Sequence, residues 1–368
     1  MNTLTVQLNQ STNLFFLPLI LTLVAALAKG GEWFIKGRAE ARLFSNPSDL
    51  IANFNDWDRI SQPQSRNRLV LFGESELSVR YQDWEAGLIS HRTRLYGNIP
   101  GSYLNIIGNF YQQRNQANEG NYAHLPTIRG YIADGWYGAL HIRPTERQRF
   151  TLRFNILHPT DLHHLNANGS GTIINNRSEM QSTIIYYSRR DYRKFFKTKD
   201  SSDASGLSID LVWSYCAQQW AIDIGIDDLF GRLVWRDAHR TTIELNTQTT
   251  WYDNYGYLHR HPFIQGKVES NQLFIQHLQP LPWIRVAASN HDLNVSLLYR
   301  HSPEVALTSL QTTLKTKWGE FGVGCELPGH YTTLLAGWKH LKISAGASNW
   351  GNPLQSNFTA SLLLQTSF

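Results

Sequence analysis

The chain ends in Phe358-Thr-Ala-Ser-Leu-Leu-Leu-Gln-Thr-Ser-Phe368, a stretch that alternates with a period of two. Alternation of this kind is typical of a β-strand with one apolar face and one wet face. The strand ends on an aromatic residue that carries the terminal carboxylate. One parity is mainly apolar and the other mainly polar: Phe358, Ala360, Leu362, Leu364, Thr366 and Phe368 against Thr359, Ser361, Leu363, Gln365 and Ser367.

This stretch resembles the closing strand of bacterial outer-membrane β-barrels, which commonly end in Phe after an apolar residue at every second position. Thr366 departs from that pattern, because such proteins usually keep a Tyr or an aliphatic residue there. The resemblance implies that Phe368 is the signal for membrane insertion by the barrel-assembly machinery. It also implies that the last strand closes against the first one, near Trp33–Leu43. A soluble chain ending in an edge strand is the alternative.

Composition favours the barrel. The 368 residues are enough for two ordinary domains or for one closed barrel. Mean hydropathy is −0.35 although 12% of the residues are aromatic and 12 are Trp, which neither disorder nor a helical membrane protein explains. In a transmembrane barrel only alternate residues face lipid, while Trp and Tyr collect at the interfaces.

The amino terminus predicts export. The apolar run Leu14–Ala28 rises roughly 22 Å as a helix, too short to cross a hydrocarbon core comfortably. Ala26-Leu27-Ala28 has the small-x-small form of a cleavage site, so we expect a cleaved signal peptide over residues 1–28, although that segment has no Lys or Arg. Residues 29–368 then form the barrel, with long loops or a small plug near 44–67, in the outer membrane of a Gram-negative bacterium.

Alternation continues through the first two thirds of the chain. It predicts a first strand over 33–43, although Gly37–Leu43 is also acceptable helix sequence. It further predicts a turn at Gln82-Asp83 that leads into a strand from Trp84 toward Tyr96. The clearest hairpin joins Leu207–Tyr215 to Trp220–Ile226.

From residue 272 onward, short strands follow one another with little between them. The fold class is therefore all-β: a single closed antiparallel transmembrane β-barrel of about 16 strands, in a range of 14 to 18. The segment 272–289 reads either as two strands or as one strand bent at Leu281-Pro282. The predicted strands are 272–279, 282–289, 292–300, 304–314, 317–327, 331–339, 341–349 and 357–368.

In many strands, charged residues occupy the alternate positions that form the polar face, and we expect these residues to face the lumen. A positive surplus there would favour anionic solutes by focusing the field. Alternatively, charges of both signs pair with each other and fill a narrow barrel. The lumen-facing candidates are Arg38, Arg42, Arg80, Arg143, Arg149, Arg153, Asp210 and Asp223.

A basic and aromatic run spans Arg189–Lys199. At a strand end, such a run is suited to the phosphates of lipopolysaccharide, and a solvated loop is the alternative. The export signal argues against nucleic acid as the partner. The candidates for lipid contact are Arg189, Arg190, Arg193 and Lys194.

Other chemistry finds little support. Cys216 shares the polar parity of its strand and Cys325 the apolar parity, so their side chains should diverge and no disulfide is expected. The histidine pairs His163-His164 and His259/His261 lack partners at metal-ligand spacing. No nucleophile elbow, zinc-protease or Walker motif occurs. We expect no enzyme, no metal and no cofactor.

Two short stretches resemble FadL-type hydrophobic-substrate transporters: Asp227–Trp235, read as strand, acidic turn and strand, and Asn46-Pro47-Ser48, with Ser in place of the family's Ala. The resemblance implies a route for apolar substrates, and it carries over no site residue. The leading hypothesis is a porin-like outer-membrane channel or transporter for small solutes, anionic ones preferred. The alternatives are a FadL-like transporter and a non-transporting barrel that serves secretion or surface-polymer export. A third class is an outer-membrane hydrolase, which needs a Ser, His and acid arrangement near the lipid belt. The sequence predicts no oligomeric state.

Overall fold

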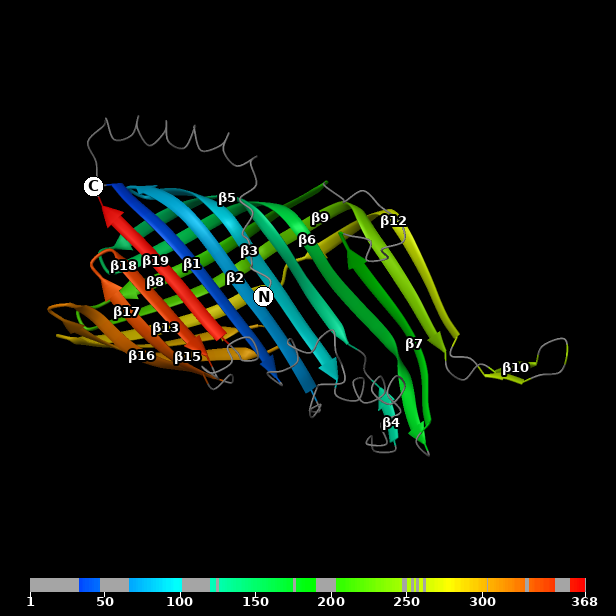
Figure 1. Ribbon diagram of the computed structural model, residues 1–368. Coiled ribbons are helices and arrows are strands. Elements are labelled where there is room, and N and C mark those ends of the chain that lie inside the picture. Colours follow the sequence, from blue (N-terminus) through cyan, green and yellow to red (C-terminus); the bar gives the residue numbers. More distant parts are fainter. Residues whose placement is uncertain are drawn as a thin grey trace.

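The computed structural model describes residues 33–46, 66–100, 120–123, 126–174, 177–189, 203–246, 250–252, 255, 258–260, 263–302, 304–327, 331–347 and 358–367. In these ranges the chain forms a closed antiparallel barrel of 14 strands, and two short strands pair outside the ring (Figure 1). The prediction of an all-β, closed antiparallel barrel is confirmed. The predicted number of strands was too high by two, although 14 lies within the predicted range. No helix in the described part of the chain is long and apolar enough to cross a membrane.

The strands of the sheet are β1 (Trp33–Asn46), β2 (Arg66–Tyr81), β3 (Trp84–Pro100), β4 (Gly120–Ala123), β5 (Thr127–Thr145), β6 (Gln148–Ile174), β7 (Arg177–Ser188), β8 (Ala204–Cys216), β9 (Trp220–Asn246), β12 (Phe263–His277), β13 (Leu281–Asn290), β14 (Leu293–His301), β15 (Ala306–Thr316), β16 (Gly319–Leu327), β17 (Tyr331–Trp338), β18 (Leu341–Ala347) and β19 (Phe358–Ser367). Outside the ring, β10 (Thr250–Tyr252) pairs with β11 (Leu258–Arg260).

The ring closes between the first and the last strand. β1 pairs with β2 on one side and with β19 on the other, where Phe34 lies opposite Ser367 and Leu43 opposite Phe358. The predicted pairing of the terminal stretch with the first strand is confirmed. Phe368 itself lies outside the described residues.

Long strands explain the lower strand number. β6 and β9 have 27 residues each, more than twice the roughly ten that a transmembrane strand needs. Each spans the height of two collinear strands: β7 and β8 together form the wall between β6 and β9, and β12 and β13 together line the other side of β9. The short β4 continues the position of β5 along β6, so the 17 strands of the sheet occupy 14 ring positions. The segment 272–289 is thus one ring position, as one of the two readings had it, with its break at residues 278–280. The part of the wall that contains β6 and β9 is here called the tall side, and it lies toward the right in Figure 1.

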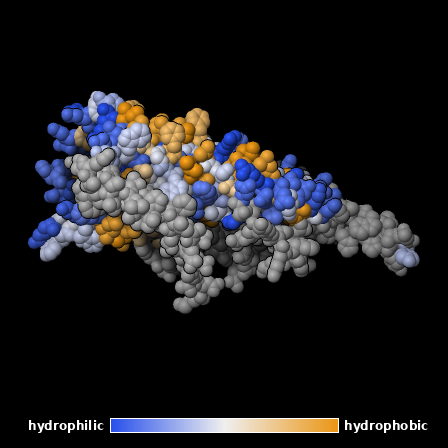
Figure 2. All heavy atoms as spheres, turned by 90° about the horizontal axis from the view of Figure 1, so that it is seen from above, coloured by the Kyte–Doolittle hydropathy of each residue, from blue (hydrophilic) through white to orange (hydrophobic). Residues whose placement is uncertain are grey.

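All described two- or three-residue turns lie at one end of the barrel, here called the short-turn end. They include Gln82-Asp83, as predicted, and the connections after Thr145, Cys216, Asn290, Thr316 and Trp338. β1 begins and β19 finishes at this same end. Figure 2 shows hydrophilic side chains gathered there and apolar ones over the adjacent wall.

The outward face of the wall is apolar, as the alternation predicted. On β19, Leu362 and Leu364 are exposed while Thr359 is buried. The same pattern holds on β6, β8, β9 and β14 to β18, with exposed outward side chains at Phe150, Phe154, Ile156, Leu207, Leu211, Ile224, Leu297, Leu310, Leu314, Phe321, Val323, Leu334 and Ile343.

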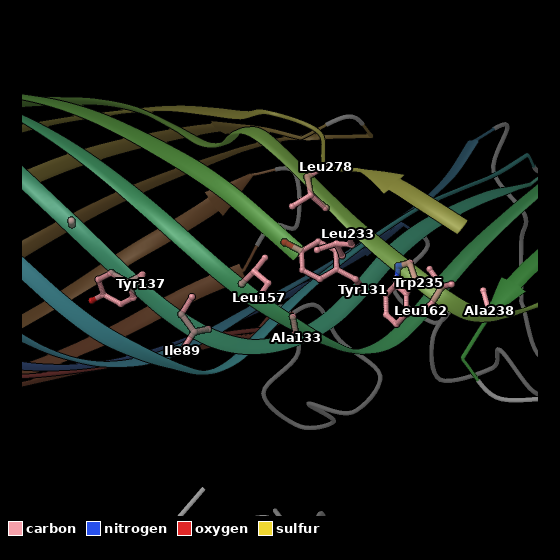
Figure 3. Packing of buried hydrophobic residues seen from close by; sticks show 11 residues of the cluster. Ile89, Tyr131, Ala133, Tyr137, Leu157, Leu162, Leu233, Trp235, Ala238 and Leu278 are labelled. Carbon is pink, nitrogen blue, oxygen red and sulfur yellow. The ribbon is translucent and has the colours of Figure 1, made fainter. Parts of the chain in front are cut away.

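An apolar cluster lies on the inner face of the tall side. It joins side chains of β3, β5, β6, β9 and the segment after β12, and Figure 3 shows Tyr131, Leu157 and Leu233 side by side in it. Tyr137 and Ala139 belong both to this cluster and to the lining of the barrel cavity, which places the cluster inside the ring. The lumen of this barrel therefore contains packed apolar side chains as well as charged ones.

Several predictions fall outside the described residues. They concern the signal peptide over 1–28, most of the loop or plug at 44–67, Pro47 and Ser48 of the short FadL-like stretch, and the basic residues Arg190, Arg193 and Lys194. The domain division thus stays a prediction.

Candidate functional site

A cavity of about 760 Å³ lies inside the barrel. Its lining runs from the short-turn end, where Arg143 is exposed, inward to Arg92, which is buried. Alternate residues of each strand point inward, so the cavity collects the wet parity of much of the wall. Its charged lining is Lys36, Arg38, Arg42, Arg80, Arg92, Arg143, Arg149, Arg153, Arg285 and Arg300 against Glu40, Glu74, Glu76, Glu85, Asp210 and Asp227.

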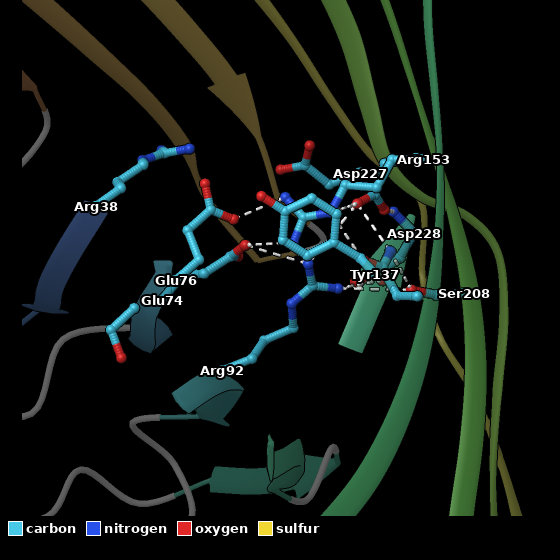
Figure 4. A network of polar contacts seen from close by, with 12 residues as sticks. Arg38, Glu74, Glu76, Arg92, Tyr137, Arg153, Ser208, Asp227 and Asp228 are labelled. Carbon is cyan, nitrogen blue, oxygen red and sulfur yellow. Dashed lines mark hydrogen bonds and ion pairs between the residues drawn. The ribbon is translucent and has the colours of Figure 1, made fainter. Parts of the chain in front are cut away.

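At the inner end of the cavity, Arg92 on β3 is surrounded by carboxylates. Its Nη2 lies 3.1 Å from Glu74 and 3.7 Å from Asp210, and its Nη1 lies 3.4 Å from Asp228 on β9. Figure 4 shows the Arg92 side chain reaching from its strand toward Asp228 and Ser208. A buried guanidinium needs such partners, because an unpaired charge is costly inside a protein.

Glu74 on β2 is shared among three arginines. Arg94 donates to Glu74 Oε2 at 2.6 Å, while Arg92 and Arg153 donate to Oε1 at 3.1 and 3.4 Å. Arg153 also donates to Glu76 at 2.8 Å. These contacts tie β2 and β3 to β6 through the lumen, so the network braces the wall from inside.

A second group of charges belongs to the opposite side of the ring. Arg42 on β1 donates to Glu40 at 2.6 Å and to Glu326 on β16 at 3.0 Å. Arg38 also donates to Glu40, at 2.5 Å. Since β17, β18 and β19 separate β16 from β1 in the ring, the Arg42–Glu326 pair links two non-adjacent strands across the lumen.

A backbone irregularity brings two consecutive acids into the lumen. Asp228 has a φ of 54° inside β9, and the pairing of β8 with β9 shifts register between Ile209 and Leu211. The Asp228 N–H donates to Asp210 at 2.8 Å, and Asp227 accepts from the Trp283 indole at 3.0 Å. The predicted strand, turn and strand over Asp227–Trp235 is therefore wrong: this stretch is a bulge within one continuous strand.

The structure places the predicted lumen residues as follows. Arg38, Arg42, Arg80, Arg143, Arg149, Arg153 and Asp210 line the cavity. Asp223 is buried and accepts a hydrogen bond from Arg285, and Arg285 lines the cavity. The charges divide by depth: the inner ones are paired, whereas Arg80, Arg143 and Arg149 form an excess of positive charge near the short-turn end.

Sequence reasoning missed Arg92, Arg94 and Asp228. The pairing of β3 with β5 shifts register between Ile89 and Arg92, so the inward parity changes from odd to even within one strand. Two arginines at alternate positions, Arg92 and Arg94, were the available signal for a wet face here.

A second cavity of about 340 Å³ lies deeper along the tall side, next to Arg94. Its lining combines aromatic and aliphatic side chains, such as Tyr96, Tyr131, Phe274 and Leu278, with polar ones that include Arg94, Arg129 and Gln276. Phe274 also stacks on Tyr187 with ring centroids 4.2 Å apart. The ionic network therefore borders both cavities, with Arg92 lining the first and Arg94 the second.

The described lipid-contact candidate and the two cysteines do not line these cavities, whereas His164 lines the second one. Arg189 donates to the Thr160 carbonyl at 2.5 Å, and it is the only described member of the predicted lipid-contact set. Cys216 and Cys325 are free and exposed, on β8 and β16. In the described ranges, no three His, Cys, Asp or Glu side chains are grouped to hold a metal ion.

No known family and no curated protein matches this sequence. Similar solved structures are outer-membrane β-barrel proteins. One is the TodX deltaS2S3 mutant monoaromatic hydrocarbon channel, with 10% identity, a TM-score of 0.41, and 93% of this chain and 91% of that chain covered. Another is the Ralstonia pickettii toluene transporter TbuX, with 8% identity, a TM-score of 0.31, and 93% and 90% covered.

The outer membrane protease OmpT from Escherichia coli is also similar, with 6% identity, a TM-score of 0.21, and 92% and 93% of the two chains covered. At these identities and TM-scores, the likenesses assign neither a substrate nor an activity to this chain.

Proposed function

We propose that this protein is an outer-membrane channel or transporter that passes small solutes through its barrel. The observation that carries the proposal is the 760 Å³ cavity, which lies inside a closed ring and is lined by charged side chains. A water-filled path through a barrel needs such a lining. The paired charges around Arg92 and Arg42 form the constriction of this path.

The outward face supports the membrane location. Side chains such as Val323 and Leu334 are more than half exposed on the wall, as expected for contact with lipid. Large aromatic side chains mark the short-turn end, with Trp84 66% and Trp318 72% exposed and Trp220 and Trp338 beside other turns of that end. Trp at this height is typical of the boundary between lipid and water. Outer-membrane lipid and lipopolysaccharide are therefore the proposed surroundings.

Small anionic solutes are the proposed cargo of the charged cavity. Its lining carries ten basic and six acidic side chains, and the surplus lies toward the short-turn end. Such a field raises the local concentration of anions. In planar bilayers with a KCl gradient, we expect a reversal potential that indicates preference for chloride. Cation preference, or no conductance at all, would contradict the proposal.

A second candidate is a route for small apolar solutes, and the aromatic cavity of about 340 Å³ favours it. With toluene as the probe, Phe274→Ser should weaken binding to the purified protein, because Phe274 lines this cavity. Leu273→Ser is the matched control, since the neighbouring Leu273 is 65% exposed. Equal toluene binding by both variants would remove this candidate.

A further inference from the structure

We propose that Arg80, Arg143 and Arg149 form a binding site for a compact oxyanion, such as phosphate or a phosphate monoester, at the short-turn mouth of the charged cavity. The use of this site as the entry point for a transported solute rests on the proposed function above. Anion binding itself does not.

Strand pairing brings the three arginines together. Arg80 lies opposite Glu85, Glu85 opposite Ala139, and Ala139 opposite Arg153, across the consecutive ring strands β2, β3, β5 and β6. Further toward the short-turn end, His141 pairs with Thr151. Arg143 and Arg149 each lie two residues beyond that pair, on the same face, and all three arginines line the cavity.

The nearby acids are engaged elsewhere or lie in solvent. Glu85 accepts from the Tyr137 hydroxyl at 2.8 Å, and its other oxygen lies 3.0 Å from His141 Nε2. Asp83 is 3.9 Å from Arg143, and both side chains are more than half exposed. Arg92 and Arg42, in contrast, contact carboxylates within about 3 Å in the inner network.

The guanidinium groups at the mouth also have hydrogen-bond donors to spare. Arg80 donates through Nε to the Gln82 carbonyl at 3.0 Å, whereas its Nη2 is buried without a partner among the described residues. Arg149 Nε is buried and unpartnered in the same sense. The positive charges of Arg149 and Arg143 both act on Arg80. Three positive charges held close together, with N–H donors that are not yet used, suit the binding of an anion.

The geometry points to phosphate chemistry because guanidinium groups present planar pairs of donors that fit tetrahedral and carboxylate oxyanions. Three cations suit a dianion better than a single carboxylate. The three guanidinium groups repel a cation and offer their donors only to an acceptor.

The test measures binding of inorganic phosphate to the purified full-length protein in nanodiscs of zwitterionic lipid, by calorimetry. We expect the double variant Arg80→Gln/Arg149→Gln to bind phosphate at least about tenfold more weakly, since each lost charge-assisted hydrogen bond is a substantial part of the affinity. The matched control is Lys317→Gln/Lys339→Gln, which removes two exposed charges from turns at the same end without touching the cavity lining. This control should bind like the wild type.

Equal loss in both double variants, or no phosphate binding by the wild type, would overturn the site. Heat-modifiable mobility on a gel shows whether each variant is folded, and Arg80→Lys/Arg149→Lys keeps charge and bulk if the Gln variant fails to fold. Nanodiscs with phosphate-bearing anionic lipid are compared with nanodiscs of equal charge whose anionic lipid has no phosphate. Weaker phosphate binding only in the former would identify a lipid headgroup as the source of the oxyanion. A conducting barrel without phosphate binding refutes only the site, and a phosphate-binding barrel without conductance refutes only the transport function.

Discussion

Arg92 on β3 and Asp228 on β9 meet across the lumen at 3.4 Å, and each side chain is only 2% exposed. Three ring positions separate their strands, so the pair holds distant parts of the wall together. Glu74 and Asp210 lie beside this pair and contact the same Arg92 guanidinium. The network thus braces the wall and fills part of the lumen.

Removal of the Arg92 charge should destabilise the barrel. Arg92→Met leaves three buried carboxylates without their common partner, and we expect a loss of about 3 kcal/mol in the free energy of unfolding. Urea unfolding of the protein in detergent measures the loss. As a control, Arg236→Met removes an exposed pair with Asp203 and should change stability by less than about 1 kcal/mol. An unchanged midpoint for Arg92→Met would contradict the bracing role.

Removal of the Arg42–Glu326 pair should widen the open part of the lumen. Arg42→Ser/Glu326→Ser keeps the net charge but deletes a pair that spans the lumen at 3.0 Å, so single-channel conductance should rise. Planar-bilayer recordings test this directly. Lys342→Ser/Glu320→Ser removes an ion pair of 2.8 Å that lies outside the cavity lining, and it should conduct like the wild type. Equal conductance of the two double variants would show that the Arg42–Glu326 pair is not the constriction.

Gly87 should be intolerant of a side chain. A Cβ at this position would lie 2.4 Å from the Tyr137 ring, which also hydrogen-bonds Glu85. We expect Gly87→Ala to cost about 1–3 kcal/mol through overpacking, measured by urea unfolding. Gly138→Ala on the neighbouring strand meets nothing within 4 Å and is the matched substitution. If both variants unfold alike, the Tyr137 contact does not limit this position.

The two free cysteines should react differently once the protein is in lipid. Cys216 shares the inward parity of Asp210 and Ser214 near a turn, whereas Cys325 shares the outward parity of Phe321 and Val323. In vesicles, a charged maleimide should label Cys216 readily and Cys325 slowly. The single-cysteine variants Cys325→Ser and Cys216→Ser separate the two signals. Rapid labelling of Cys325 in intact vesicles would mean that the outward face is in water.

Much of the fold was predictable because a period of two is a local property. Leu362 and Leu364 alternate with Ser361 and Gln365, and that pattern alone indicates which side faces outward. The closure of β19 on β1 followed from the resemblance of the terminal strand to those of other barrels. Strand number was less accessible, because nothing local distinguishes one 27-residue strand from two shorter ones.

The inner network was beyond prediction for a different reason. Arg92 faces inward only because of a register shift in β3, and Asp228 only because of a bulge in β9. Both irregularities depend on how neighbouring strands pair, and that information is distributed over the whole sheet. Arg80, Arg143 and Arg149 were predicted to face the lumen individually, but their grouping depends on strand order.

The pairing of β1 with β19 also has a kinetic meaning. Leu43 and Phe358 come from opposite ends of the described chain, so their ladder closes one of the longest loops that this sequence can form. Contacts of such long range make folding slow. Until β19 arrives, β1 presents an unpaired edge on which another chain can add a strand. Docking of β19 removes that edge, so the first and the last strand of the ring protect each other from pairing with a second chain.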